Sequence, residues 1–162
     1  MIHLIVGNTG SGKTTYAREL KRKTKGILFT IDKWNNTLFL ADKTPDDGLE
    51  WVLERIERAE EMMMDLIVQL ENSNTDAILD LGLSKFKHRE KFRTFAKLNG
   101  FAVQFHFLDV SKETRFSRVM QRNQEKGATY EFEVSKENFD FMETWFEIPN
   151  ENELIDGIII SE

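Results

Sequence analysis

A glycine-rich stretch near the start of the chain has residue types and a spacing that suit phosphate binding. It reads Gly-x-x-x-x-Gly-Lys-Thr and runs from Gly7 to Thr14. Glycines let the backbone curl so that successive N–H groups point at one spot, and the N-terminus of a following helix adds partial positive charge there. Lys13 would then contact the β- and γ-phosphates of a nucleoside triphosphate, and the Thr14 hydroxyl would ligate Mg²⁺.

The context of this stretch favours a phosphate-binding loop over a plain glycine-rich turn. An apolar run precedes it at residues 1–6, and a helical pattern follows at residues 14–23. Strand, glycine loop and helix in this order form the setting in which the motif binds phosphate. We therefore expect a bound nucleoside triphosphate, with these residues around its phosphates: Gly7, Asn8, Thr9, Gly10, Ser11, Gly12, Lys13, Thr14 and Thr15.

Two aspartates follow apolar runs that are typical of strands. Asp32 follows residues 26–31, and Asp80 lies within residues 78–82. Ligands of an open parallel sheet bind at the carboxyl ends of its strands. Asp32 would accept the proton of a substrate hydroxyl, although it would also suit a helix N-cap if a helix began at Lys33. Asp80 would hold Mg²⁺ directly or through water, or it is a turn aspartate.

Three arginines share one face of a predicted helix because they are three and four residues apart. They are Arg115, Arg118 and Arg122. Like charges on one face repel, so an anionic partner is the favoured interpretation for Arg118 and Arg122. For Arg115 the alternative stays open, namely a solvated face paired with nearby acids (Asp109, Glu113 and Glu125).

The histidines carry less information than the arginines. His3 and His106 fall within predicted strands, where we expect packing residues. His88 and Arg89 follow the third predicted strand and could reach a substrate, or they could simply begin a surface helix.

The bulk properties indicate one α/β domain. The chain has 162 residues, 40% of them hydrophobic, with a formal net charge of −6 and no cysteine. Thiolate metal sites and cysteine nucleophiles are therefore excluded, and a general nucleic-acid-binding surface is disfavoured. No apolar stretch approaches the roughly 20 residues that span a bilayer. We expect a cytoplasmic protein without a signal segment.

The elements that must position these residues alternate along the chain. Strands are expected at 2–6, 26–31, 77–81, 102–108 and 157–160, and helices at 14–23, 49–70, 88–98, 113–126 and 136–146. Near-continuous apolar strands are typical of a parallel sheet covered on both faces. The predicted fold is a three-layer α/β sandwich.

Together these residues resemble the small P-loop kinase-like proteins grouped with zeta toxin, chloramphenicol phosphotransferase, gluconate kinase and the polynucleotide kinase domain. The nearest resemblance is to the AAA-type ATP-binding "predicted kinase" branch. It rests on the glycine loop, Asp32, residues 79–82 with Arg89, the Arg118-x-x-x-Arg122 pair and the segment 132–153.

The resemblance implies an adenylate-kinase-like sheet of order 2-3-1-4-5 and a lid at about residues 118–134. It also implies ATP as the nucleotide and Mg²⁺ as the metal. By similarity, Asp32 is the general base and Arg122 is the lid arginine on the ATP phosphates. Polynucleotide kinase has an arginine three residues after its base, where this chain has Asn35. A nucleic-acid 5′ end is therefore a doubtful acceptor.

The sequence thus predicts a single domain, residues 1–162, that transfers the γ-phosphate of ATP to a small-molecule hydroxyl. Lys13, Asp32 and Arg122 are the expected catalytic residues, and Thr14 and Asp80 the expected metal ligands. One alternative is an ATP-binding switch or slow ATPase that acts on a protein partner. A nucleic-acid end kinase is a more distant alternative, and a non-enzymatic structural protein is disfavoured because it would not need Lys13.

Overall fold

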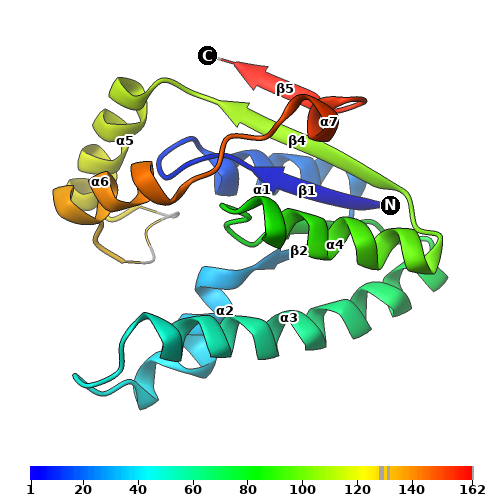
Figure 1. The fold of residues 1–162 in the computed structure, drawn as a ribbon, viewed down its shortest axis with the longest axis horizontal. Helices are drawn as coiled ribbons and strands as arrows, with labels where there is room; N and C mark the ends of the chain where they lie inside the picture. Colours follow the sequence, from blue (N-terminus) through cyan, green and yellow to red (C-terminus); the bar gives the residue numbers. More distant parts are fainter. Residues whose placement is uncertain (128–129, 131, 162) are drawn as a thin grey trace.

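A five-stranded parallel sheet forms the centre of the molecule, as seen in the computed structural model (Figure 1), which describes residues 1–127, 130 and 132–161. The strands lie in the order β2-β3-β1-β4-β5, and all neighbours are parallel. Their bounds are β1 (Ile2–Val6), β2 (Ile27–Thr30), β3 (Ala77–Asp80), β4 (Val103–Asp109) and β5 (Ile158–Ser161). The predicted strand order 2-3-1-4-5 is confirmed.

Helices cover both faces of this sheet, and the core is divided accordingly. Along β1, Ile2, Leu4 and Val6 belong to the larger apolar cluster, together with Met63 of α3 and Phe92 of α4. A smaller cluster with Ile5 and Ala17 lies on the face that α1 covers. The helices are α1 (Lys13–Thr24), α2 (Ile31–Leu38), α3 (Leu49–Asn72), α4 (Phe86–Asn99), α5 (Lys112–Glu125), α6 (Lys136–Trp145) and α7 (Glu151–Leu154), with a 3₁₀ turn at Leu40–Asp42. The predicted three-layer sandwich is confirmed.

The junction after β2 differs from the expectation. The predicted strand 26–31 included Ile31, but α2 begins at that residue and Thr30 occupies its N-cap position. Ile31 is buried in the larger core cluster, so burial of its side chain fixes the first turn of the helix. Asp32 therefore lies inside the first helical turn, and the prediction of a possible N-cap at Asp32 was wrong.

Helix α3 extends well beyond the sheet and packs on it unevenly. Met63 and Ile67, in its second half, are fully buried. Leu49 and Leu53, in its first turns, are 50% and 43% exposed, although Leu49 was expected on the buried face. A helix of 24 residues spans about 36 Å, which is longer than the four- and five-residue strands it crosses. The first half packs on α2 instead, and the two helices project together from the body (Figure 1).

Helices α5 and α6 form a separate pair beside the glycine loop (Figure 1). Serines cap both helices, because Ser111 accepts a hydrogen bond from the Thr114 N–H and Ser135 accepts one from the Asn138 N–H. Between the helices, Phe116 and Phe139 meet edge to face with ring centroids 5.2 Å apart. This pairing fixes α6 against α5.

The predicted lid, at about residues 118–134, comprises the second half of α5 and most of the connection to α6, and its residues 128, 129 and 131 lie outside the described residues. The two ends of this connection are joined by the Asn123 side chain, which donates to the Val134 carbonyl (2.8 Å) and accepts from the Val134 N–H (3.2 Å). In the part of the chain that the structure describes, no helix is long and apolar enough to cross a membrane.

Candidate functional site

The glycine loop between β1 and α1 has the backbone that its sequence requires. Gly10 and Gly12 have φ angles of 83° and 94°, a region that side chains disfavour. A Cβ atom at Gly10 would also lie 2.5 Å from the Arg115 carbonyl oxygen, so glycine permits the close approach of α5. Gly12 is the N-cap of α1 and supplies no side-chain hydrogen bond to the first turn. The first N–H groups of α1 therefore stay available to an anion.

The Lys13 side chain lies at this loop, in a polar setting that includes carboxylates. Its ammonium donates to the Asn8 carbonyl oxygen at 3.2 Å. Burial lowers the pKa of Lys13 below its ordinary value, while the carboxylates of Asp80 and Asp32 oppose that shift. Negative phosphates at the loop would raise the pKa of Lys13 again, because nearby opposite charge stabilises the ammonium form.

Thr14 and Asp80 bring a hydroxyl and a carboxylate together at the ends of two neighbouring strands. The Thr14 hydroxyl donates to the Asp80 carboxylate at 2.7 Å. Mg²⁺ prefers oxygen ligands and in nucleotide sites takes only one or two from protein, with the rest from phosphates and water. Among the described residues there is no cluster of three or more His, Cys, Asp or Glu that could hold a metal. The pair thus fits a magnesium ion that arrives with a nucleotide.

Asp32 lies on the first turn of α2 and lines the same cavity as Lys13, Thr14 and Asp80. The sheet register explains this convergence, because Thr30 at the end of β2 pairs with Asp80 at the end of β3. The two aspartates expected from the sequence thus meet at one edge of the sheet.

The predicted arginines separate into two groups. Arg118 and Arg122 both line the cavity, and an Arg118 guanidinium nitrogen donates to the Ser11 carbonyl at 3.5 Å. The Nε atom of Arg122 is buried and has no hydrogen-bond partner among the described residues. A buried unpaired donor is costly, so this N–H is suited to donate a hydrogen bond to an anionic ligand.

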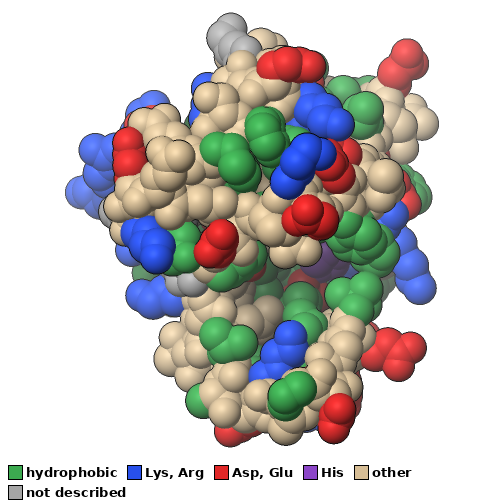
Figure 2. Space-filling view, turned by 90° about the vertical axis from the view of Figure 1, so that its left-hand side faces the viewer, with side chains coloured by type: hydrophobic (Ala, Val, Ile, Leu, Met, Phe, Trp, Pro, Cys, Tyr) green, Lys and Arg blue, Asp and Glu red, His purple; other side chains and the backbone are tan. Residues whose placement is uncertain are grey.

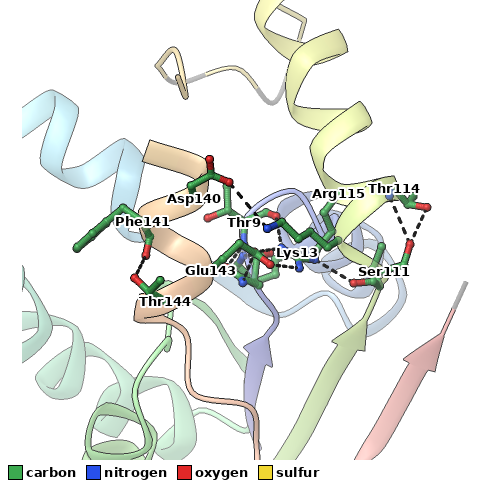
Figure 3. A network of polar contacts seen from close by, with 12 residues as sticks. Thr9, Lys13, Ser111, Thr114, Arg115, Asp140, Phe141, Glu143 and Thr144 are labelled. Atoms are coloured by element: carbon green, nitrogen blue, oxygen red, sulfur yellow. Dashed lines mark hydrogen bonds and ion pairs between the residues drawn. The ribbon is translucent and has the colours of Figure 1, made fainter. Parts of the chain in front are cut away.

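Arg115 has neither of the two roles considered for it from the sequence, which were phosphate binding and a place on a solvated helix face. It is buried and holds Glu143 of α6 through both guanidinium NH groups, at 2.5 and 2.8 Å (Figure 3). It also donates to the Thr9 carbonyl at 3.3 Å, and Glu143 accepts from the Asn8 amide at 2.6 Å. The expected solvated face with Asp109, Glu113 or Glu125 is therefore wrong for Arg115, which joins α5, α6 and the glycine loop.

Arg89 and His88 are not part of the site. Arg89 is fully buried and forms a two-point ion pair with Glu153, at 2.6 and 3.1 Å. His88 contacts the buried carboxylate of Glu60 on α3. Both side chains therefore join elements of the fold, and the expectation that they could reach a substrate was wrong.

His3 and His106 are packing residues, as predicted. Their rings share a hydrogen bond of 3.0 Å under α1, and Tyr16 adds a second one to His106 at 2.9 Å. Burial, and to a lesser extent the nearby His3, lowers the pKa of His106 to about 4. Both rings are therefore satisfied within the fold.

The cavity around the glycine loop has a volume of about 660 Å³, within the usual range of ligand sites. Figure 2 shows the face on which the molecule is hollowed, between an upper part and a lower projection. Besides the glycine loop, the two aspartates and the two arginines, the lining includes Gly82 and residues for which the sequence indicated no role in the site: Ser84, Val119, Gln121, Glu125, Gly127, Phe132, Val134, Asn138, Phe141 and Met142. Several of these, such as Phe132, Phe141 and Met142, contribute apolar surface to the cavity.

Comparisons with known proteins agree with this geometry. Kti12 from Chaetomium thermophilum, solved with ADP-AlF3, matches with a TM-score of 0.71 at 17% identity over 99% of this chain and 89% of its own. A gluconokinase from Sinorhizobium meliloti 1021 matches with a TM-score of 0.63 at 16% identity (99% and 81%). A sugar kinase from Janibacter sp. HTCC2649 matches with a TM-score of 0.60 at 18% identity (99% and 84%).

These distant structures show that the fold is shared, whereas sequence comparison also identifies the family. No curated protein sequence matches the chain. The sequence profile of the AAA domain matches residues 2–149, which is most of the chain. Glycine loop, sheet order and profile agree, and the chain therefore belongs to this AAA domain family, with the fold of the P-loop kinases.

Proposed function

We propose that the protein is a phosphotransferase that moves the γ-phosphate of Mg·ATP to a hydroxyl of a small molecule. The acceptor oxygen forms a bond to the γ-phosphorus, and the bond from that phosphorus to the β–γ bridging oxygen breaks. The electron pair of the broken bond leaves with ADP, and the hydroxyl proton passes to the Asp32 carboxylate. The chain acts as a single kinase-like domain, residues 1–162.

One observation carries this proposal, namely that Asp32 shares the cavity with Lys13 and Thr14. The Asp32 carboxylate, like that of Asp80, also opposes the lowering of the Lys13 pKa by burial. A carboxylate facing the phosphate loop is the group that a hydroxyl acceptor needs as its base. A protein that only bound ATP would have no use for a base at this place.

The other residues of the cavity position and neutralise charge. The loop amides and Lys13 hold the β- and γ-phosphates, and Arg118 and Arg122 contact the equatorial oxygens of the transferred group. Thr14 and Asp80 would hold Mg²⁺, which supplies positive charge to the phosphates when bound. Phosphoryl transfer relies mostly on positioning and electrostatics, so this set is sufficient.

The segment of residues 118–134, which contains the second half of α5 and most of the connection to α6, is proposed as the lid over the ATP phosphates. Arg118 and Arg122 at its start already line the cavity, which supports this role. Amide hydrogen exchange of peptides from residues 123–134 is expected to slow when Mg·ATP binds. Equal exchange with and without nucleotide would argue against a lid.

We propose that the enzyme is cytoplasmic and that its acceptor is a small molecule. A nucleic-acid end is disfavoured as the acceptor. The net charge of −6 opposes a polyanion, and Asn35 stands where polynucleotide kinase has its acceptor-binding arginine. The similar gluconokinase and sugar kinase are, by name, small-molecule kinases.

A second candidate is an ATP-binding switch or slow ATPase that acts on a protein partner. The exposed leucines on the α2–α3 projection favour it: Leu38, Leu40, Leu49 and Leu53 are all at least 43% exposed. A switch would have no saturable small-molecule acceptor, which distinguishes it from a kinase.

The test is transfer of labelled γ-phosphate from Mg·ATP into a fractionated small-metabolite extract. We expect a labelled product, and Asp32→Asn should reduce its formation by about 10²–10⁴-fold, the usual worth of a general base. ATP affinity should remain, because Asp32 does not hold the phosphates. Lys13→Ala is the control and should abolish turnover with the fold intact. Labelled inorganic phosphate alone, formed equally by Asp32→Asn, would favour the switch.

A further inference from the structure

The cavity has two chemically different halves. The described cations in its lining are Lys13, Arg118 and Arg122, which belong to the glycine loop and α5. A second wall is built from the start of α2, the end of β3 with the residues that follow it, the segment that leads into α6, and α6 itself. That wall contributes carboxylates, small polar groups and apolar side chains, and no cation among its described residues.

The apolar part of this wall includes large side chains that the fold does not bury. Phe132 and Phe141 are 49% and 48% exposed, and Met142 lines the cavity beside them. Phe139 provides an internal contrast, because it is only 1% exposed and anchors α6 to Phe116. Phe139 thus supplies the aromatic contact that packs α6 on α5, whereas Phe141 lines the cavity.

The orientation of Phe141 places it on the acceptor side of the phosphate loop. In Figure 3 it points away from Glu143, toward the side of the view where α2 lies. Helix α2 carries Asp32, the proposed base, and both residues line the same cavity. Trp145, one turn further along α6, stacks on Phe141 with ring centroids 5.6 Å apart and planes 29° apart.

Charges near this wall would not favour an anionic acceptor. Asp32 and Asp80 both face it, and a second phosphate or a carboxylate would be repelled by them. Lys85, which lies over the Trp145 ring at 4.4 Å, does not line the cavity and is paired with Glu147 at 3.3 Å. Ser84 and Asn138 add hydrogen-bonding groups without charge.

We propose that the acceptor is an uncharged alcohol with a flat aromatic group, which stacks on Phe141 while its hydroxyl faces Asp32. This inference rests on the proposed kinase function and names the substrate class of that site. Phe132 and Met142 cover the edge of the ring, and Ser84 and Asn138 bind its polar substituents. The transferred phosphoryl group comes from ATP, and the hydroxyl proton goes to Asp32 as described above.

The test compares acceptors that differ in ring and charge, with labelled ATP as the donor. Benzyl alcohol, phenylethanol and thymidine carry a flat ring and no charge, whereas glucose lacks the ring and gluconate and glycerol phosphate are anionic. We expect label in the ring-bearing alcohols, with Phe141→Ala raising their KM about tenfold or more, since one stacking side chain contributes about this much. Phe141→Trp should restore the KM, and the KM for ATP should not change. Phe86→Ala is the control, because Phe86 on α4 is 44% exposed but does not line the cavity.

Several outcomes would overturn the proposal. Preferred transfer to gluconate or glycerol phosphate would do so and would leave the kinase function standing. A rise in the KM for ATP in Phe141→Ala would show that the wall holds the adenine base instead. If no acceptor is labelled, calorimetry of thymidine binding to the Mg·ADP complex decides. Binding lost in Phe141→Ala would support the aromatic subsite and refute the kinase function, whereas no binding would refute the subsite.

Discussion

Two buried arginine–glutamate pairs in this protein have similar geometry and different locations. Arg89 and Glu153 are essentially unexposed, whereas Arg115 and Glu143 retain 8% and 18% of their side-chain surface. Each guanidinium makes two contacts with its carboxylate and further bonds to backbone carbonyls. The first pair fixes the segment that leads to β5, and neither of its residues lines the cavity. The second contacts the glycine loop through Asn8. We therefore expect the first pair to contribute to the stability of the fold and the second to contribute to nucleotide binding.

The largest effect is expected from breaking the first pair. Arg89→Met leaves the Glu153 carboxylate buried without its partner, which should lower the free energy of unfolding by about 3–5 kcal/mol. Urea denaturation measures this loss. ATP affinity, measured where the variant is folded, should stay unchanged. Adding Glu153→Leu should recover part of the stability, because it removes the unpaired charge. A variant as stable as the wild type would contradict the structural role of Arg89.

An intermediate effect is expected from the second pair. Glu143→Ala removes the acceptor shared by Arg115 and Asn8 and should weaken ATP binding about tenfold, equal to about 1.4 kcal/mol. Isothermal titration calorimetry measures the affinity. Asp140→Ala is the matched control, because Asp140 lies on the same helix and forms only exposed pairs with Lys136 and Lys112. Equal ATP affinity in the two variants would show that the Arg115–Glu143 pair, like the first pair, does not contribute to nucleotide binding.

The smallest effect at neutral pH is expected from a third buried polar cluster, which contains no arginine. His106 has a pKa of about 4 in the fold against an ordinary 6.5, so the unfolded chain takes up this proton first. Its contribution to stability is therefore complete above pH 6.5 and is lost as the pH falls toward 4. Urea denaturation across this range should show a steeper decline in the wild type than in His106→Asn. Parallel curves would mean that His106 does not titrate in this range.

The central part of the fold and the phosphate half of the site could be predicted from the sequence. Apolar strands, the glycine loop and the aspartates that follow β2 and β3 are local patterns, and the strand order came from the family resemblance. Lys13, Thr14, Asp32 and Asp80 line one cavity as expected. Their catalytic and metal-binding roles stay predictions.

The remainder depends on contacts between distant parts of the chain. Arg89 finds its partner 64 positions away and Arg115 finds Glu143 28 positions away, so no local spacing signals either pair. The sequence left each arginine open between a ligand and an exposed helix surface, and the structure assigns both to ion pairs. Phe141 was also missed, because an aromatic residue on an amphipathic helix looks the same whether it packs inside or faces a cavity.

The uneven packing of α3 has a consequence for local unfolding. Its second half, with Met63 and Ile67 fully buried, should open only with the whole molecule. Its first half has few buried contacts and packs on α2, the helix that carries Asp32. A single continuous helix would then contain a stable half and a half that opens at low cost. The acceptor side of the site could in this way loosen and close again while the cradle for the ATP phosphates stays rigid.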